Sequence, residues 1–231
     1  MKTRFSVVIP CFNEGKNIEI LLEQVKESIL SQGIEVILVN NGSNDESVKI
    51  FKLLSAKKVL GLKVINLSEN AGYGGGILAG LNEADGEYIG WTHADLQTDI
   101  KDLINAFCLA EKHTFVKGRR VGRNLFENFF SIGMAIFESL ILRSVLWEIN
   151  AQPNVFHNSF FKTWKNPPKD FSLDLFAYYQ AKKLDFDIKR IKVRFPPRKF
   201  GHSSWNSGLA SRLRLIKRTI EYSLKLRKNI S

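Results

Sequence analysis

Short apolar runs alternate with helix-like segments through the first half of this 231-residue chain. The apolar runs cover residues 5–10, 34–39, 62–67 and 87–92, and the intervening segments cover residues 14–32, 44–55, 77–84 and 99–112. The runs are short and rich in apolar residues, as buried parallel strands are, whereas the first intervening segment places its apolar residues at helical spacing. The alternation therefore predicts an α/β fold with a doubly wound, mostly parallel sheet.

Four loops follow the predicted strands, and sheets of this kind bind ligands at the carboxyl ends of their strands. In the first loop, Asn13 is able to cap the following helix and Glu14 suits its positive end, so these residues need no ligand. In the second loop, the amides of Asn40 and Asn41 suit the edge of a uracil or guanine base, but a turn capped by Asn44 explains them equally well.

The third and fourth loops carry the residue types that phosphates and metal ions require. Glycines at residues 72–76 let backbone N–H groups approach a phosphate or ribose closely. Asp95 is able to hold a divalent cation against a diphosphate, although a lone aspartate after a strand also serves as a turn or cap residue. In an extended segment, His93 and Gln97 would point to the same side as Asp95.

The charge of +11 is unevenly distributed along the chain. Residues 1–113 contain 11 Lys and Arg against 15 Asp and Glu, whereas residues 114–231 contain 23 against 8. This asymmetry favours an anionic partner for the second half, such as phospholipid, a phosphorylated substrate or nucleic acid, or else a solvated basic face. Two cysteines are too few for a disulfide scaffold, and the apolar stretch at the start is too short for the core of a signal peptide. We therefore expect a cytoplasmic protein.

The four loops lie within the sequences SVVIPCFNE, VNNGSND, NAGYGGGILAGLNEADGEYI and THADLQ. In this order and spacing, over residues 1–120, they resemble the family-2 glycosyltransferases of GT-A fold, and within them the dolichol-phosphate mannose synthase and polyprenyl-phosphate glycosyltransferase branch. The second half matches more loosely, at residues 118–120, at Asp174 and at residues 198–206. The resemblance implies a GT-A domain over residues 1–206, with a nucleotide-sugar-binding half at 1–120 and an acceptor half at 121–206, followed by a basic amphipathic C-terminal helix at 207–231.

The resemblance also implies roles for the residues at matching positions. These roles are nucleotide-sugar binding by Pro10, Asn13, Glu14, Asn41, Gly72, Asp95 and Arg119, catalysis by Asp95, Asp174 and Arg198, and metal binding by His93, Asp95 and Gln97. Two departures from the family pattern bear on these roles. Asn40 and Asn41 replace a pair of aspartates, and His93 replaces the first aspartate of the metal-binding motif. Histidine ligates Mn²⁺ better than Mg²⁺, so the implied cofactor is Mn²⁺ or Mg²⁺, with His93 favouring Mn²⁺.

Two segments of the second half bear on membrane contact. Residues 124–147 are rich in Phe, Leu and Ile but are interrupted by charges, which fits an interfacial helix or a core helix better than a transmembrane span. Residues 208–228 combine apolar residues at helical spacing with seven Lys and Arg, which suits an anionic membrane surface or a solvated helix packed on the domain.

The sequence therefore predicts a cytoplasmic glycosyltransferase, peripheral at the membrane, that moves a sugar from a nucleoside-diphosphate sugar to a polyprenyl phosphate or lipid-linked glycan in cell-envelope or surface-polysaccharide biosynthesis. The alternative is a catalytically impaired nucleotide-sugar-binding or scaffold protein, because His93 weakens the metal motif. An NAD-dependent oxidoreductase is disfavoured because the glycine cluster follows the third strand rather than the first. We expect no nucleic-acid partner, since such a partner would explain the charge but not the four loops.

Overall fold

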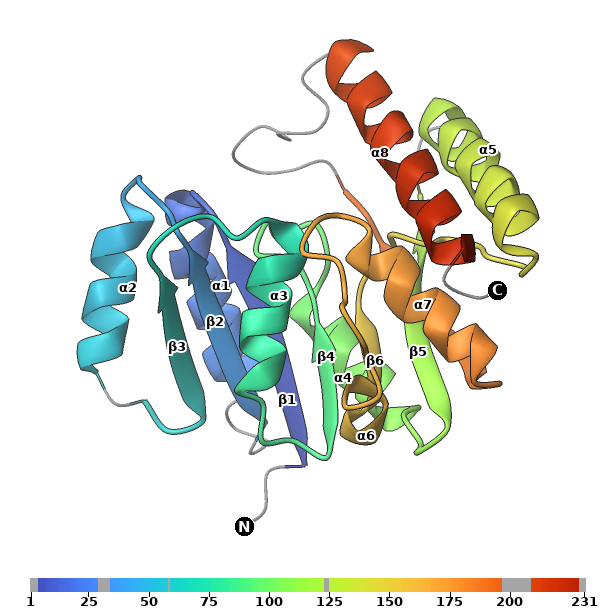
Figure 1. Cartoon of the computed structure of the whole chain (residues 1–231). Coiled ribbons are helices and arrows are strands. Elements are labelled where there is room, and N and C mark those ends of the chain that lie inside the picture. The colour runs from blue at the N-terminus through green and yellow to red at the C-terminus, as the bar shows by residue number, and fades with distance from the viewer. Residues whose placement is uncertain (1–3, 29–33, 58, 123–124, 197–208, 229–231) are drawn as a thin grey trace.

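The computed structural model describes residues 4–28, 34–57, 59–122, 125–196 and 209–228. Its strands are β1 (Phe5–Cys11), β2 (Glu35–Asn41), β3 (Leu62–Leu67), β4 (Tyr88–Trp91), β5 (Thr114–Val121), β6 (Asn154–His157) and β7 (Asp187–Arg194). Its helices are α1 (Gly15–Ser28), α2 (Ser47–Ala56), α3 (Tyr73–Asn82), α4 (Ile100–Cys108), α5 (Leu125–Leu142), α6 (Asn158–Phe161), α7 (Leu173–Lys183) and α8 (Leu209–Lys228). Figure 1 shows one sheet with helices on both faces, as the sequence predicted.

The strands form a seven-stranded sheet in the order β3-β2-β1-β4-β6-β5-β7. The pairs β3–β2, β2–β1, β1–β4 and β5–β7 are parallel, and β6 runs antiparallel to both of its neighbours. The prediction of a mostly parallel sheet is therefore confirmed. The carboxyl ends of β1 to β4 lie at one edge of the sheet, and β6 begins at that same edge because it runs in the opposite direction.

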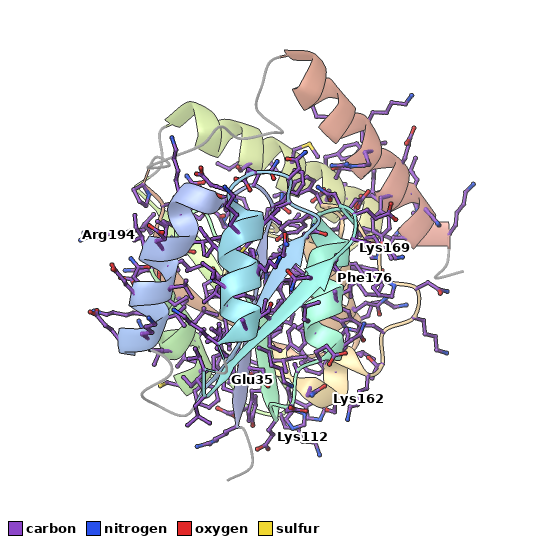
Figure 2. The ribbon with its side chains drawn as sticks, turned by 90° about the vertical axis from the view of Figure 1, so that its left-hand side faces the viewer. Glu35, Lys112, Lys162, Lys169, Phe176 and Arg194 are labelled. Atoms are coloured by element: carbon purple, nitrogen blue, oxygen red, sulfur yellow. The ribbon has the colours of Figure 1, made fainter. Side chains whose placement is uncertain are left out.

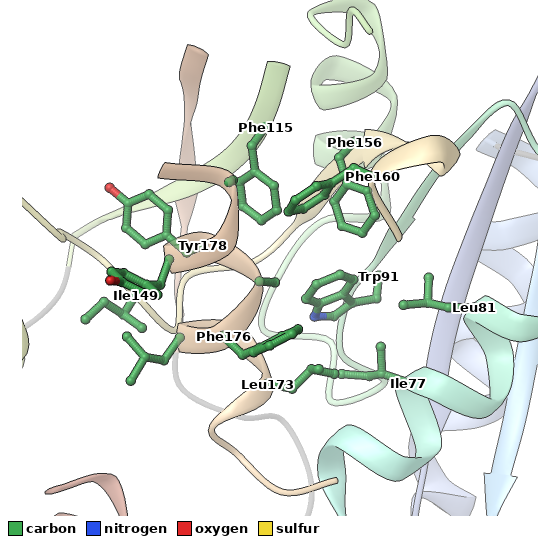
Figure 3. Close-up of a cluster of buried hydrophobic side chains, with 14 of the residues drawn as sticks. Ile77, Leu81, Trp91, Phe115, Ile149, Phe156, Phe160, Leu173, Phe176 and Tyr178 are labelled. Carbon is green, nitrogen blue, oxygen red and sulfur yellow. The ribbon is translucent and has the colours of Figure 1, made fainter. Parts of the chain in front are cut away.

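Two hydrophobic clusters fill the space between the sheet and its helices. Alternate side chains of β1 enter different clusters, since Val8 packs with α3 and α7 whereas Val7 and Ile9 pack with α1 and α4. The first cluster is rich in aromatic side chains that contact one another edge to face or stacked (Figure 3). Its rigid packing supports α3 and α7, whose first turns lie at the edge where the strand-end loops meet.

The structure corrects one expectation for local structure. Gly74, Gly75 and Gly76 belong to α3 rather than to a preceding turn. They allow helix and backbone to approach closely, because a Cβ on Gly74 would lie 2.6 Å from the Pro168 carbonyl oxygen. The aromatic run 154–164 contains the inner strand β6 and helix α6.

Candidate functional site

The four predicted loops meet at one edge of the sheet, because β3, β2, β1 and β4 are neighbours and run parallel. Lys169 lies at this end, near the glycine loop, whereas Glu35 lies toward the opposite end (Figure 2). The amide nitrogen of Gly75 donates to the Lys169 carbonyl oxygen at 2.9 Å. The segment before α7 is therefore joined to the loop edge through the first turn of α3.

The loops after β1 and β2 are linked by Asn13. Its side-chain nitrogen donates to Asn44 Oδ1 at 2.9 Å, and its Oδ1 accepts from the Asn44 amide at 2.9 Å. Its own amide donates to Ser43 Oγ at 3.1 Å, and its backbone is left-handed with φ of 56°. Asn13 thus joins two loops instead of capping α1, whose first backbone bonds go to the carbonyl oxygen of Glu14. Pro10 borders the same loops and is half-buried.

The glycine loop after β3 is held by the side chain of Asn41. This buried amide donates to the Gly72 carbonyl oxygen at 2.9 Å and accepts from the Ala71 amide at 3.0 Å. Gly72 has φ of 82°, and a Cβ there would lie 2.6 Å from the Lys169 carbonyl oxygen. The hydrogen-bonding capacity of Asn41 is directed at the loop backbone, so its contact with a nucleotide base stays a prediction.

The loop after β4 is not extended. Leu96 is left-handed with φ of 59°, and Asp95 Oδ1 accepts from the Gln97 amide at 3.1 Å. Gln97 Nε2 donates to the Pro196 carbonyl oxygen at 2.9 Å, whereas the His93 ring lies 5.6 Å from the Tyr73 ring, between centroids. The expectation that all three side chains point one way from an extended segment is therefore wrong, since the turn at Leu96 redirects the chain.

The side chains of this loop would hold a cation only together with oxygen atoms of a substrate. Asp95 is buried at 4% exposure, and within the described residues no group of three or more His, Cys, Asp and Glu is placed to hold a metal ion. Mg²⁺ in nucleotide sites is commonly held by one or two carboxylates together with phosphate oxygens. The residues present fit that arrangement, with Asp95 as the protein carboxylate.

Asp174 lies in a buried polar cluster that the sequence did not predict as a cluster. Asp174 Oδ1 accepts from Gln152 Nε2 and from Asn154 Nδ2, both at 2.9 Å, and its Oδ2 accepts from the Tyr73 hydroxyl at 2.8 Å. Lys117 Nζ donates to Asn154 Oδ1 at 2.7 Å. We call Tyr73, Lys117, Gln152, Asn154 and Asp174 the polar cluster. It lies at the loop edge because the first residue of β6 pairs with the last residue of β4.

Burial shifts the pKa values of two members of the polar cluster. Burial lowers the pKa of Lys117 to about 7, and Arg190 and Arg120 act in the same direction while the Asp174 carboxylate opposes them. Burial also raises the pKa of Tyr73 well above its usual value, and the negative charge of Asp174 adds to the shift. Tyr73 therefore stays a protonated donor to Asp174. Asp174 is the one member of this cluster that was singled out from the sequence.

The two arginines of β5 are placed differently. Arg119 is exposed near the end of β5. Arg120 pairs with Glu148 at 2.7 Å, and its guanidinium lies over the Phe195 ring. Arg119 is thus the arginine that remains accessible to a phosphate. The predicted catalytic Arg198 lies outside the described residues, as does the rest of the segment 198–206.

Helix α8 contacts the site through the loop before α7. Arg218 lies 3.6 Å from Asp170 Oδ2, and its guanidinium lies over the Phe171 ring. Phe171 stacks on Tyr73 at 4.8 Å between centroids, and Tyr73 in turn contacts His93. A continuous row of contacts therefore runs from α8 to the loop after β4. Within the described residues, no helix combines the length and the hydropathy needed to cross a bilayer.

Curated relatives match part of the chain. The undecaprenyl-phosphate 4-deoxy-4-formamido-L-arabinose transferase of Proteus mirabilis is 35% identical over 129 residues, which are 55% of this chain and 39% of that protein. The dodecaprenyl-phosphate galacturonate synthase of Rhizobium johnstonii is 33% identical over 100 residues, which are 42% of this chain and 30% of that protein. The matched region thus spans less than half the length of these relatives.

Solved structures share the fold. A mannosyltransferase from Pyrobaculum calidifontis, in complex with GDP-mannose and Mn²⁺, superposes with a TM-score of 0.68 at 18% identity, over 97% of this chain and 65% of that one. Glucosyl-3-phosphoglycerate synthase from Mycobacterium tuberculosis, with Mn²⁺, UDP-glucose and phosphoglyceric acid, gives a TM-score of 0.71 at 14% identity, over 97% and 79%. The model of the family "Glycosyl transferase family 2" matches residues 6–168. This chain belongs to glycosyl transferase family 2.

Proposed function

We propose that the protein is a nucleotide-sugar-dependent glycosyltransferase that transfers a sugar from a nucleoside-diphosphate sugar to a polyprenyl phosphate in cell-envelope biosynthesis. The observation that carries this proposal is the meeting of the four strand-end loops at one edge of the sheet, with the buried carboxylate of Asp95 in the loop after β4. Relatives named for polyprenyl-phosphate substrates and structural neighbours that hold nucleotide sugars support it.

In this proposal the loops after β1, β2 and β3 form the nucleotide site. Pro10, Asn13 and Glu14 border the nucleotide, and Asn41 acts by fixing the glycine loop at Gly72 as well as by any contact with the base. The glycine loop presents backbone that a ribose or phosphate is able to approach closely. Because Asn13 and Asn41 are held by hydrogen bonds to neighbouring loops, the site is organised before the donor arrives.

The leaving diphosphate is the second element of the proposal. Asp95 would hold Mn²⁺ or Mg²⁺ with the diphosphate, and His93 and Gln97 contribute by positioning their loop against Tyr73 and Pro196. Such an ion, when bound, stabilises the charge that develops on the leaving group. Arg119 adds a guanidinium that suits phosphate oxygens, and we assign Arg198 the same role.

The polar cluster favours a phosphate over a sugar hydroxyl as the acceptor. A hydroxyl needs a general base, whereas an acceptor phosphate is already ionised. The carboxylate of Asp174 accepts three hydrogen bonds from Tyr73, Gln152 and Asn154 and is 3% exposed. We therefore propose that Asp174 acts on the acceptor side by positioning Tyr73 rather than by removing a proton.

We also propose that the protein works as a peripheral protein at the cytoplasmic face of the membrane, where a polyprenyl phosphate would present its head group.

The second candidate function is a nucleotide-sugar-binding or scaffold protein without turnover. The residue His93 favours it, because Asp95 is then the only carboxylate of the motif and the His93 ring lies against Tyr73.

A thermal-shift screen with UDP-, GDP- and TDP-sugars, each with Mn²⁺, Mg²⁺ or EDTA, tests donor binding. A donor at about 100 times its Kd adds about 2.7 kcal/mol of stability, which corresponds to about 5–10 °C in Tm for a chain of this size. We expect such a shift with one nucleotide and a metal ion, and its loss in Asp95→Asn. Asp187→Asn is the matched control, because Asp187 is exposed at the start of β7. No shift with any donor in the folded protein would contradict the proposal.

A further inference from the structure

Helix α5 and the loop that follows it carry several exposed apolar side chains. Five of the twelve large hydrophobic side chains that are exposed in the described part of the chain fall within residues 132–147. They are Ile132 at 37%, Ile136 at 53%, Leu140 at 73%, Val145 at 81% and Trp147 at 42% exposure, and we call them the α5 ridge. The first three are spaced four residues apart, so they lie on one side of the helix.

The loop after α5 carries two of these side chains. Ser139 Oγ accepts from the Leu146 amide at 2.9 Å, and Ser139 Oγ also lies 3.1 Å from the Leu146 carbonyl oxygen. These bonds hold the loop at Leu146 against the turn of α5 that contains Ser139, so Val145 and Trp147, on either side of Leu146, lie close to that turn. An exposed apolar group of this size on a soluble surface is typical of a binding site rather than of scattered exposure.

The opposite side of α5 is buried in the protein. Ala135, Glu138 and Leu142 are each no more than 4% exposed, and α5 packs beside α8 (Figure 1). Core packing thus explains the inner side of the helix and leaves the α5 ridge unexplained. A helix that is apolar on both its inner and its outer side needs a second apolar environment.

Exposed cations lie directly after α5 and on the neighbouring helix α8. Arg143 follows the end of α5, and α8 exposes Lys217, Lys225, Arg227 and Lys228. The single acidic residue of α8 is Glu221, which lies 3.9 Å from Lys217. Apolar side chains bordered by cations complement a bilayer surface that contains anionic lipid, where each nearby cation strengthens binding. A second copy of the chain would bring these like charges near one another, which opposes self-association through the same face.

We propose that the α5 ridge inserts into the interfacial layer of an anionic lipid bilayer while the cations of α8 and Arg143 contact the lipid phosphates. Figure 1 places α5 and α8 beyond the sheet edge where the site loops meet, and Arg218 joins α8 to the loop that supports Tyr73. Docking through the ridge therefore holds the site close to the membrane surface. The purpose of this docking rests on the proposed function, but the docking itself is measured without any sugar.

The test is co-sedimentation of the full chain with vesicles of phosphatidylglycerol and phosphatidylethanolamine, compared with phosphatidylcholine vesicles. We expect binding to the anionic vesicles that weakens with salt. The triple variant Ile136→Ser, Leu140→Ser and Val145→Ser should lower the partition coefficient at least about tenfold. The matched control is Leu53→Ser with Leu60→Ser, which removes exposed apolar side chains of α2 and its following loop and should bind as the wild type does.

The outcomes separate docking from the proposed activity. Loss of vesicle binding in the ridge variant, with an unchanged thermal shift by the nucleotide sugar, supports the proposal. Equal vesicle binding by the ridge variant and the wild type overturns it, whether or not the protein transfers sugar. Light scattering that shows a wild-type dimer and a monomeric ridge variant, with no vesicle binding by either, also overturns it and assigns the ridge to self-association.

Discussion

At the scale of single residues, Asn154 links the two buried charges next to the site. Its Oδ1 accepts from Lys117 Nζ, and its Nδ2 donates to Asp174 Oδ1. Both charged side chains are almost fully buried, so neither is solvated by bulk water. A buried ammonium that is only partly neutralised loses its proton more readily in the folded protein than in the unfolded chain. The polar cluster should therefore show itself in the pH dependence of stability.

We predict that Lys117 makes the protein more stable as pH rises above its lowered pKa of about 7. Between this value and the ordinary value of 10.5, the unfolded chain binds the proton and the folded protein does not, so unfolding becomes less favourable as pH rises. Relative to Lys117→Met, the wild type should gain about 1 kcal/mol per pH unit in this range. Urea denaturation across it measures this gain. The control is Lys192→Met, at an exposed position of β7, whose free energy of unfolding should change with pH as that of the wild type does. If the free energy of unfolding depends on pH equally in Lys117→Met and Lys192→Met, the prediction is contradicted.

A second residue-scale prediction concerns Gly72. Alanine there would carry the strain of a left-handed backbone and a Cβ contact of 2.6 Å with the Lys169 carbonyl oxygen. We expect Gly72→Ala to lower the free energy of unfolding by about 2–4 kcal/mol. Gly122→Ala is the control, because its φ of 78° is similar but a Cβ would meet nothing within 4 Å, so it should cost only about 1 kcal/mol. Equal losses in urea denaturation would show that the Lys169 contact contributes nothing.

At the scale of elements, the position of α3 on the sheet depends on close contact with β1. A Cβ on Gly80 would lie 2.3 Å from Val8 Cγ1, so the helix and the strand meet where the helix has no side chain. The first turn of α3 carries Tyr73 and the glycines of the loop edge. Displacement of α3 would therefore move the polar cluster and the nucleotide loop together.

We predict that Gly80→Ala destabilises the protein by about 1–3 kcal/mol through overpacking and weakens donor binding as α3 shifts. The matched variant is Gly133→Ala in α5, where a Cβ meets nothing within 4 Å. That substitution should be neutral or stabilise by up to about 1 kcal/mol, because alanine favours a helix more than glycine does. If the two variants unfold at the same urea concentration, α3 does not depend on this contact.

At the scale of the whole molecule, the alternation of strands and helices in the first half predicted the parallel sheet and the edge where Asp95 lies. The second half was harder to predict, because β6 has only four residues, too few to show the period-two pattern of a strand. Its antiparallel direction brings Asn154 to the loop edge, and no local pattern indicates strand direction. Lys117 was not singled out from the sequence, since its acceptors on other segments become neighbours only in the folded chain.

The most direct test of the central claim is transfer of labelled sugar from the donor that shifts Tm to undecaprenyl phosphate, measured as lipid-linked product. The account predicts metal-dependent product with the wild type and with Asp187→Asn, and a loss of about 100-fold or more in Asp95→Asn, because the leaving diphosphate then lacks its carboxylate-held cation. Absence of lipid-linked product with every donor that binds, or an unchanged rate in Asp95→Asn, would contradict it.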